Sequence, residues 1–202
     1  MARLYVPYEY MLNGYRNDAV SCVPVIPNVT KGWHDQNIRS HFEQIAELAK
    51  RSGIMIGNLG WIEPFAKAGI PVYGDYGLNL YNSMDFFVAR ELGIKEAVIS
   101  HEAVTEDIIK MNFYEVIPEV VIAGRIPLMV SEHSFAEDLE LDKREKGNYK
   151  FYLKDRKGEA YPFYWDDKSG KSTIFSYRLR NNWEDAEIFK SYGLKSFRIY
   201  GE

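Results

Sequence analysis

The stretches that decide the predicted fold are Gly57-Asn58-Leu59-Gly60 and Gly74-Asp75-Tyr76-Gly77-Leu78-Asn79-Leu80-Tyr81-Asn82-Ser83. Each follows a short apolar run, Ile54-Met55-Ile56 before the first and Ile70-Pro71-Val72-Tyr73 before the second. Such runs are typical of buried parallel strands. Glycine, asparagine and aspartate tolerate unusual backbone angles and hydrogen-bond locally. Because parallel α/β folds build their sites at the carboxyl ends of strands, the pattern predicts a polar site on a βα scaffold.

Outward from these stretches, apolar runs of strand type alternate with segments of helical spacing. The expected strands are residues 4–7, 22–26, 54–56, 72–73, 97–99, 120–122 and 128–130. The expected helices are residues 37–51, 61–68, 83–92 and 105–111, the last with Thr105 as its N-cap. A strand and a helix that recur every 20 to 25 residues or so predict right-handed βαβ units and a parallel sheet.

The pattern changes near residue 137, before a complete barrel could form. An eight-fold barrel takes about 250 residues, and only about five βα units fit here. We therefore expect an α/β fold whose residues 1–136 form a parallel sheet equivalent to part of a TIM-like (βα) barrel. Residues 137–148 are a charged loop, and residues 149–202 are a small β-rich extension with a terminal helix. The extension is expected to hold a hairpin around Asp155-Arg156-Lys157-Gly158, a strand at 172–176, a helix at 183–192 and a strand at 195–200.

Composition narrows the class of protein. The chain has 202 residues, of which 46% are hydrophobic and 15% aromatic, enough to bury a sizeable core. A net charge of −4 with interspersed signs gives no strong nucleic-acid signal. The sequence contains no run of about 18 apolar residues, so no membrane-spanning helix is expected. The N-terminus does not resemble a signal peptide, and a cytoplasmic location is therefore expected. The single cysteine, Cys22, excludes a disulfide within the chain.

Polar residues at the expected strand ends form the candidate site. Ser100-His101-Glu102 and Glu132-His133-Ser134 each follow an expected strand, so their side chains can reach the carboxyl edge, although ordinary loop capping is an open alternative. The catalytic candidates are His101, Glu102 and His133; the substrate-binding candidates are Asn58, Asp75, Asn79, Asn82 and Arg125. Arg125 is equally well explained as a solvated arginine. Glu119 stands at the start of its strand, where a partner for a lysine or arginine fits better than a catalytic acid.

Several of these segments occur in the order of a known family. They are Gly57-Asn58-Leu59-Gly60, Gly74-Asp75-Tyr76-Gly77-Leu78-Asn79, Ser100-His101-Glu102, the run from Glu119 to Met129, and Leu153-Lys154-Asp155-Arg156-Lys157-Gly158. Together they resemble the collagenase-like peptidases, family thirty-two among the peptidases of unknown mechanism. The resemblance runs from about Val6 to Thr173 and corresponds to the later barrel portion and the small β region.

The resemblance implies a peptidase, that is, a hydrolase acting on a peptide or protein substrate. In that chemistry His101 or Glu102 would be the general base for water, and Arg125 or Asn79 would stabilise an oxyanion. The alternative is a non-catalytic or accessory subunit of a related hydroxylase acting on RNA bases or quinone precursors.

The resemblance also bears on cofactors and partners. Relatives of the hydroxylase type carry an iron–sulfur cluster, but the matching places here read Ser134, the region of Gly147-Asn148, and Gly170, so no cluster and no other cofactor is expected. A weak divalent metal held by Asp75, Glu102 and His133 stays open. The resemblance lacks the family's early barrel strands, so a partner chain or self-association is expected to complete the barrel and cover an apolar interior face.

Overall fold

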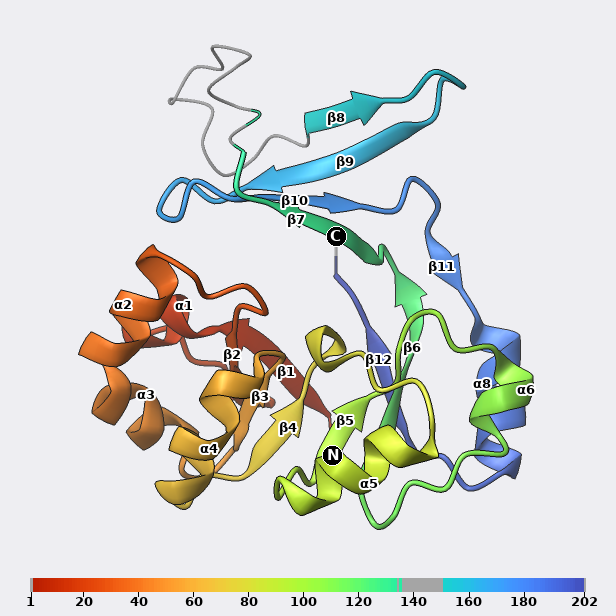
Figure 1. Cartoon of the computed structure of the whole chain (residues 1–202), viewed down its shortest axis with the longest axis horizontal. Coiled ribbons are helices and arrows are strands. Elements are labelled where there is room, and N and C mark those ends of the chain that lie inside the picture. The colour runs from red at the N-terminus through yellow and green to blue at the C-terminus, as the bar shows by residue number, and fades with distance from the viewer. Residues whose placement is uncertain (1, 134, 136–150, 202) are drawn as a thin grey trace. The chain divides into compact units, whose positions relative to one another are not determined.

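The computed structural model describes residues 2–133, 135 and 151–201. In these residues the protein is a mixed α/β structure with two sheets (Figure 1). It divides into two compact units, one of Met1–Val121 with Glu184–Arg198 and one of Ile122–Trp183 with Ile199–Glu202. The charged loop expected at 137–148 lies outside the described residues.

The larger sheet begins with six neighbouring parallel strands, as the sequence predicts. They are β1 (Arg3–Pro7), β2 (Ser21–Ile26), β3 (Ile54–Ile56), β4 (Val72–Gly74), β5 (Glu96–Val98) and β6 (Ile117–Gly124). The strand β12 (Ser196–Ile199) also pairs with β6. The strand β11 (Arg180–Asn181) pairs antiparallel with the last residues of β6. Sheet order therefore follows chain order from β1 to β6, which places all their carboxyl ends along one edge.

The helices of the first unit are α1 (Tyr8–Leu12), α2 (Trp33–Ser40), α3 (Phe42–Ala49), α4 (Leu59–Lys67), α5 (Ser83–Glu91), α6 (Thr105–Ile108) and α8 (Trp183–Ser191), with a 3₁₀ turn η1 at Tyr76–Leu78. α3 packs on β2, and α4 packs on β3 and β4. No helix among the described residues is long and apolar enough to cross a bilayer.

Two helix predictions need correction. The helix expected at 37–51 is the pair α2 and α3, which separate at His41. The His41 ring nitrogen Nδ1 lies 2.9 Å from the Asn37 carbonyl oxygen, so the side chain competes for a helical acceptor, and φ and ψ of His41 (−115° and 17°) leave the helical region. In α6 the N-cap is Val104, not Thr105, which is already helical.

The two faces of this sheet differ in chemistry. Ile54 and Ile56 of β3 are fully buried on the helix side, as are Ile45 of α3 and Phe65 of α4. The residues between them in each strand face the other way. In register with one another on that face are Met55 of β3, Tyr73 of β4 and Glu96 of β5. Burial on both faces explains the continuous apolar runs in the sequence.

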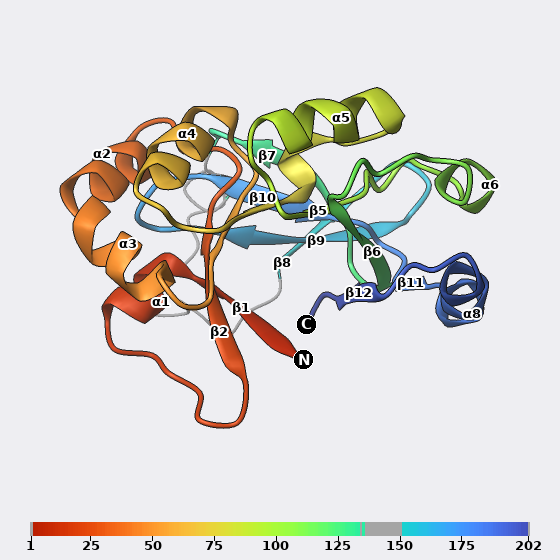
Figure 2. The same cartoon turned by 90° about the horizontal axis from the view of Figure 1, so that it is seen from below.

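The sheet curls around this second face. Arg3 in β1 lies 2.5 Å from Glu96 in β5, although three strands stand between them. Strand spacing would separate β1 and β5 by roughly 19 Å in a flat sheet. The first unit is therefore a curled half-barrel, and Figure 2 shows it turned by 90° from the view of Figure 1. The expectation of an apolar interior face is wrong, because the concave face carries charged side chains.

The second unit contains an antiparallel sheet in the order β7-β10-β9-β8. Its strands are β7 (Pro127–Ser131), β8 (Phe151–Lys154), β9 (Ala160–Trp165) and β10 (Ser172–Phe175). The predicted hairpin of β8 and β9 and the third strand are confirmed. β7 was expected in the parallel sheet, but it pairs antiparallel with β10. Only Arg125 and Ile126 separate β6 from β7, whereas a parallel crossover needs about a dozen residues.

Candidate functional site

Asn28, which follows β2, is enclosed by the two glycine-rich stretches. A Cβ on Gly57 would lie 1.7 Å from Asn28 Oδ1, and one on Gly77 would lie 2.7 Å from Asn28 Cγ and 2.6 Å from the Gly57 oxygen. Glycine is therefore required at positions 57 and 77, because a Cβ at either position would overlap neighbouring atoms. Asn28 Oδ1 is buried and accepts no hydrogen bond within the described part of the chain.

Tyr76 continues this cluster toward β5. Its hydroxyl is hydrogen-bonded by the Asn28 side chain, and its ring stacks on His101 with centroids 5.3 Å apart and an interplanar angle of 25°. Burial, followed by the neighbouring Asp75 charge, raises the pKa of Tyr76 to about 12, against a smaller lowering by the Asn28 hydrogen bond. Tyr76 is therefore a neutral phenol at any physiological pH. The predicted catalytic residue His101 lies at this edge, on an aromatic face.

Asn79, a predicted substrate-binding residue, also lies at this edge. It is in the left-handed region with φ 50°, and its Oδ1 accepts a hydrogen bond from Ser100 Oγ at 2.6 Å. The Glu102 amide donates to the same Ser100 Oγ at 3.2 Å. The Glu102 side chain itself is exposed. This arrangement joins the end of β5 to the turn after β4 and holds His101 between Ser100 and Glu102.

Two other predicted substrate-binding residues cap helices. Asn58 accepts a hydrogen bond from Gly60 N at the start of α4, while its Nδ2 lies 3.3 Å from both the Asn28 oxygen and Thr30 Oγ1. Asn82 and Asp85 form a capping box at the start of α5. These side-chain oxygens already accept hydrogen bonds from backbone N–H groups at the helix start, so they stabilise the helices. Asn58 remains part of the edge cluster through its amide nitrogen.

A histidine–carboxylate pair that the sequence analysis did not single out lies at the carboxyl end of β1. His34 Nδ1 is 3.2 Å from Glu9 Oε1 and 3.5 Å from the Tyr8 hydroxyl, which accepts a hydrogen bond from Asn37 Nδ2 at 2.8 Å. His34 and Tyr8 are buried. The signal available in the sequence was position alone: Glu9 lies two residues after the first strand, and His34 lies in the connection after the second.

These residues form one continuous polar row, here called the edge row, along the carboxyl ends of β1 to β5. Its members are Glu9, Asn28, Thr30, His34, Asn58, Tyr76, Asn79, Ser100 and His101. The backbone links its two halves, because Asp35 N donates to the Thr30 oxygen at 2.7 Å. Chemically the row offers two imidazoles, one with a carboxylate partner, and several amide and hydroxyl groups.

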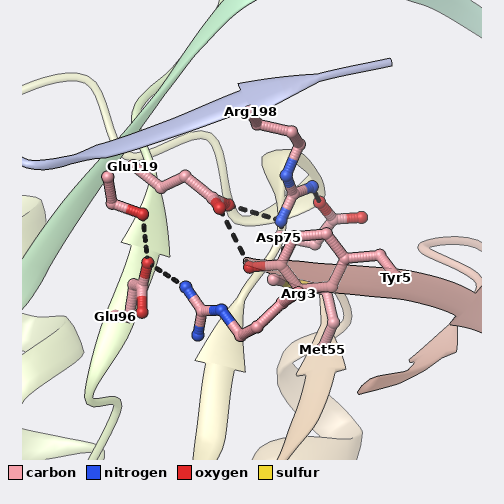
Figure 3. A network of polar contacts seen from close by, with 8 residues as sticks. Arg3, Tyr5, Met55, Asp75, Glu96, Glu119 and Arg198 are labelled. Atoms are coloured by element: carbon pink, nitrogen blue, oxygen red, sulfur yellow. Dashed lines mark hydrogen bonds and ion pairs between the residues drawn. The ribbon is translucent and has the colours of Figure 1, made fainter. Parts of the chain in front are cut away.

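Asp75, another predicted substrate-binding residue, points toward Arg198 in the half-barrel (Figure 3). It is buried and accepts a hydrogen bond from Arg198 Nη1 at 2.7 Å. Arg198 Nη2 lies 2.5 Å from Glu119 Oε2, and the guanidinium carbon lies 4.2 Å from the centroid of the Tyr5 ring. The prediction that Glu119 partners a basic residue is confirmed. Asp75 is therefore an ion-pair partner of the C-terminal strand.

A second layer of the same network joins β1, β5 and β12. Glu96 Oε1 accepts from Arg3 Nη2 and from Ser196 Oγ, each at 2.5 Å, and Tyr5 donates to Glu119 Oε1 at 2.9 Å. Among the described residues, the interior thus holds two guanidinium groups and three carboxyl groups, the third being that of Asp75 (Figure 3). The charges are paired but not balanced, and one carboxyl group is in excess.

The pKa values of the network follow from burial and pairing. Burial raises the pKa of Glu119, and the opposing effects of the Arg198 charge and the Tyr5 hydrogen bond do not cancel it. Burial and the Glu119 charge raise the pKa of the Tyr5 phenol. Burial alone lowers the pKa of Arg3, but the hydrogen bond to Glu96 and nearby negative charges raise it above its ordinary value. The Glu119 carboxyl group is therefore more readily protonated than an ordinary glutamate.

Arg125 and His133 belong to the second unit. Arg125 Nη1 donates to the carbonyl oxygens of Ser176 and Tyr177 at 2.9 and 2.7 Å. These bonds join the short connection between β6 and β7 to the turn after β10. The His133 ring meets the Phe135 ring edge-to-face at 5.2 Å.

The described residues offer few side chains that could together bind a metal ion or an iron–sulfur cluster. Among residues 2–133, 135 and 151–201, no three His, Cys, Asp or Glu side chains group as metal ligands. Asp75, one of the three ligands considered for a divalent ion, is paired with Arg198. The single cysteine lies in β2, so this chain does not fit the four thiolates that a [4Fe–4S] cluster takes.

No family model and no curated protein matches this sequence. Among solved structures, one similar chain is titled "Crystal structure of C-terminal domain of putative chitinase from Desulfitobacterium hafniense DCB-2". The match has a TM-score of 0.42 and 11% sequence identity, and it covers 96% of this chain and 77% of that chain. A similarity at this level carries no statement about activity.

Proposed function

We propose that this protein is a peptidase-like hydrolase whose site is the edge row, and that its first unit corresponds to the later part of the TIM-like barrel of the collagenase-like peptidases. The observation that carries the proposal is the Glu9–His34 pair at the same edge as Asn58 and His101. Sites of α/β folds lie at this edge of the sheet.

The chemistry assigns the roles. Peptide hydrolysis needs a base that takes a proton from water, and an imidazole held by a carboxylate is suited to that task because the carboxylate stabilises the imidazolium that forms. His34 has that partner in Glu9. His101 is the second candidate base, and the Asn79 amide nitrogen is a candidate donor to a developing oxyanion.

The experiment compares three histidine variants. Purified protein is incubated with gelatin and with a fluorogenic peptide library, and cleavage is followed for the wild type and for His34→Gln, His101→Gln and His41→Gln. His41 lies between α2 and α3 and is not part of the edge row, so it is the matched control. If one of the two edge-row histidines is the general base, its variant, His34→Gln or His101→Gln, should have a kcat about 10²- to 10⁴-fold lower than the wild type. The His41→Gln control should keep the wild-type kcat. No cleavage by the wild type, or an equal loss in all three variants, would refute the proposal.

The second candidate is an accessory subunit of a hydroxylase-type relative. It is favoured by the commitment of Asp75, Asn82 and Arg125 to contacts of the fold. Affinity purification of the tagged protein from its own cells tests it. Co-purification of a cluster-containing relative at constant stoichiometry would support this role, and recovery of the tagged chain alone would count against it.

A further inference from the structure

The exposed dipeptide Asn13-Gly14 directly follows α1, the short helix that carries Glu9 of the edge row. It is the only place in the sequence where glycine follows asparagine. The backbone nitrogen of the next residue can attack the side-chain carbonyl of an asparagine, and a Cβ on that next residue hinders the attack. Glycine has no Cβ, and the surroundings of Gly14 are open, since a Cβ built there would meet no atom within 4 Å. The Asn13 side chain is therefore open to attack by the Gly14 nitrogen.

The hydrogen bonds of the helix end decide how readily this nitrogen is released. In the folded protein Gly14 N donates to the Met11 carbonyl oxygen at 3.1 Å, and this bond must open before the nitrogen can react. The Met11 oxygen also accepts a hydrogen bond from Arg16 Nη1 at 2.9 Å. It keeps that partner when the Gly14 bond opens, so the cost of an unsatisfied acceptor is avoided. Because α1 has only five residues, its end is expected to open at low cost.

We propose that Asn13 is a site of spontaneous deamidation. The Gly14 nitrogen forms a bond to Cγ of Asn13, the bond from Cγ to Nδ2 breaks, and ammonia leaves with the proton that the Gly14 nitrogen gives up. Water then opens the succinimide ring that has formed. Attack of water at the side-chain carbonyl gives aspartate, and attack at the main-chain carbonyl gives isoaspartate, whose backbone is longer by one carbon atom. Water is the only other reactant.

Asn17 provides a comparison within the same loop. It is also exposed, but Asp18 follows it, so a Cβ hinders the attack. Its Oδ1 accepts hydrogen bonds from Ala19 N and Val20 N at 2.9 and 3.1 Å. These bonds fix the side-chain carbonyl group, which would have to turn before the Asp18 nitrogen could reach it. Asn17 is therefore expected to react much more slowly than Asn13.

The modification would alter the end of α1. Gly14 N and Tyr15 N both donate to carbonyl oxygens of this helix, an arrangement that closes a helix C-terminus. Isoaspartate lengthens the chain between the helix and these two donors, so both bonds are displaced. A new negative charge at a helix C-terminus is also unfavourable. Because α1 holds Glu9 against His34, the modification is expected to loosen this end of the edge row.

Peptide mapping by mass spectrometry tests the site. Wild-type protein is kept for several weeks in mildly alkaline buffer at physiological temperature, once folded and once unfolded in guanidinium chloride. In the folded protein, Asn13 should deamidate at least about tenfold faster than Asn17. Its rate should also lie within about tenfold of the rate in the unfolded chain, which corresponds to an opening cost of at most about 1.4 kcal/mol.

Asn13→Gln is the matched variant, because glutamine keeps the amide group but would have to form a larger ring. It should stop the reaction at position 13 and leave Asn17 as it is in the wild type, and circular dichroism verifies its fold. After equal incubation, hydrogen exchange at the end of α1 should be faster in the wild type than in Asn13→Gln. A folded protein in which Asn13 reacts no faster than Asn17, or more than about tenfold slower than in the unfolded chain, would overturn the proposal.

Discussion

Arg198 shows how much a single side chain can connect. It reaches Asp75 after β4 and Glu119 in β6, and it lies over the Tyr5 ring of β1. Burying charges is expensive, so the pairs add little net stability beyond an apolar core, but removal of one partner leaves the others uncompensated. Arg198 therefore matters chiefly for which strands stay together.

Arg198→Met is expected to lower the free energy of unfolding by about 3–5 kcal/mol, because it leaves two buried carboxyl groups without their guanidinium partner. Urea unfolding at pH 7 measures the change. Lys67→Met is the control, since its ion pair with Glu63 is exposed on α4 and should matter little. Similar losses in the two variants would contradict the view that the interior network is coupled.

Glu119→Gln is expected to alter the pH dependence of stability. The folded-state pKa of Glu119 lies above its ordinary value of 4.5. Proton binding by this group therefore contributes stability that is fully present below the unfolded pKa and is lost as pH rises through the folded pKa. Glutamine does not titrate, so the variant should gain on the wild type as pH rises from about 4 and then level off.

Urea titrations at half-unit steps between pH 4 and 8 measure this difference. Glu43→Gln, exposed on α3, controls for the loss of one negative charge. Curves for wild type and Glu119→Gln that run parallel over this range would show that Glu119 ionises as readily in the folded as in the unfolded chain.

At the scale of elements, the turns after β2, β3 and β4 depend on close backbone approach. Gly57 and Gly77 leave room for Asn28, and Asn58 and Asn82 begin the helices that follow. The same local features that close these βα connections also place Tyr76 and His101 at the carboxyl edge. A change in one turn should therefore alter both stability and the edge row.

Gly57→Ala should destabilise the protein by about 1–3 kcal/mol, because the new Cβ would overlap Asn28 Oδ1 and force that side chain to move. Thermal unfolding gives the loss, and hydrogen exchange should locate it in the turns after β2 and β4. Gly201→Ala adds a Cβ in open space and is the control. An unchanged midpoint for Gly57→Ala would show that the turn relaxes without penalty.

For the whole molecule, the C-terminal strand decides whether the half-barrel is filled. β12 pairs with β6 and brings Ser196 and Arg198 into the concave face, where they meet residues from β1, β5 and β6 and Asp75, which follows β4. The residues that form the site edge come from the first half of the chain. Their support thus depends on a segment that is distant in sequence, as Arg198 and Asp75 are 123 positions apart.

A chain that ends at Lys195 should lose cooperative unfolding of the first unit, because the interior carboxyl groups then lack Arg198 and the concave face is open to water. Dye binding to exposed apolar surface and hydrogen exchange in β4 to β6 report this loss. A chain that ends at Tyr200 keeps the strand and is the control. Equal unfolding midpoints for the two truncated chains would show that β12 is dispensable.

The sequence predicted where the polar residues after the strands lie better than it predicted which contacts they make. Asn79 and His101 lie at the carboxyl edge as expected, since strand–turn spacing alone puts them there. Asp75 follows the same rule, yet its side chain turns into the half-barrel, because a buried arginine from a distant strand competes for it. The Glu9–His34 pair was not singled out, since the two residues are 25 positions apart and neither lies in a recognisable motif.

What the sequence determined by itself is the order of elements from β1 to β6, the hairpin of β8 and β9, and the edge at which polar residues gather. These features follow from the spacing of apolar residues, from glycines in turns and from helix-capping residues. All of these signals depend on residues that are close together in the sequence. Only the tertiary structure decided that β7 leaves the parallel sheet, that β12 pairs with β6, and that the concave face is charged. Those outcomes depend on pairing between strands far apart in the chain, which local pattern does not encode.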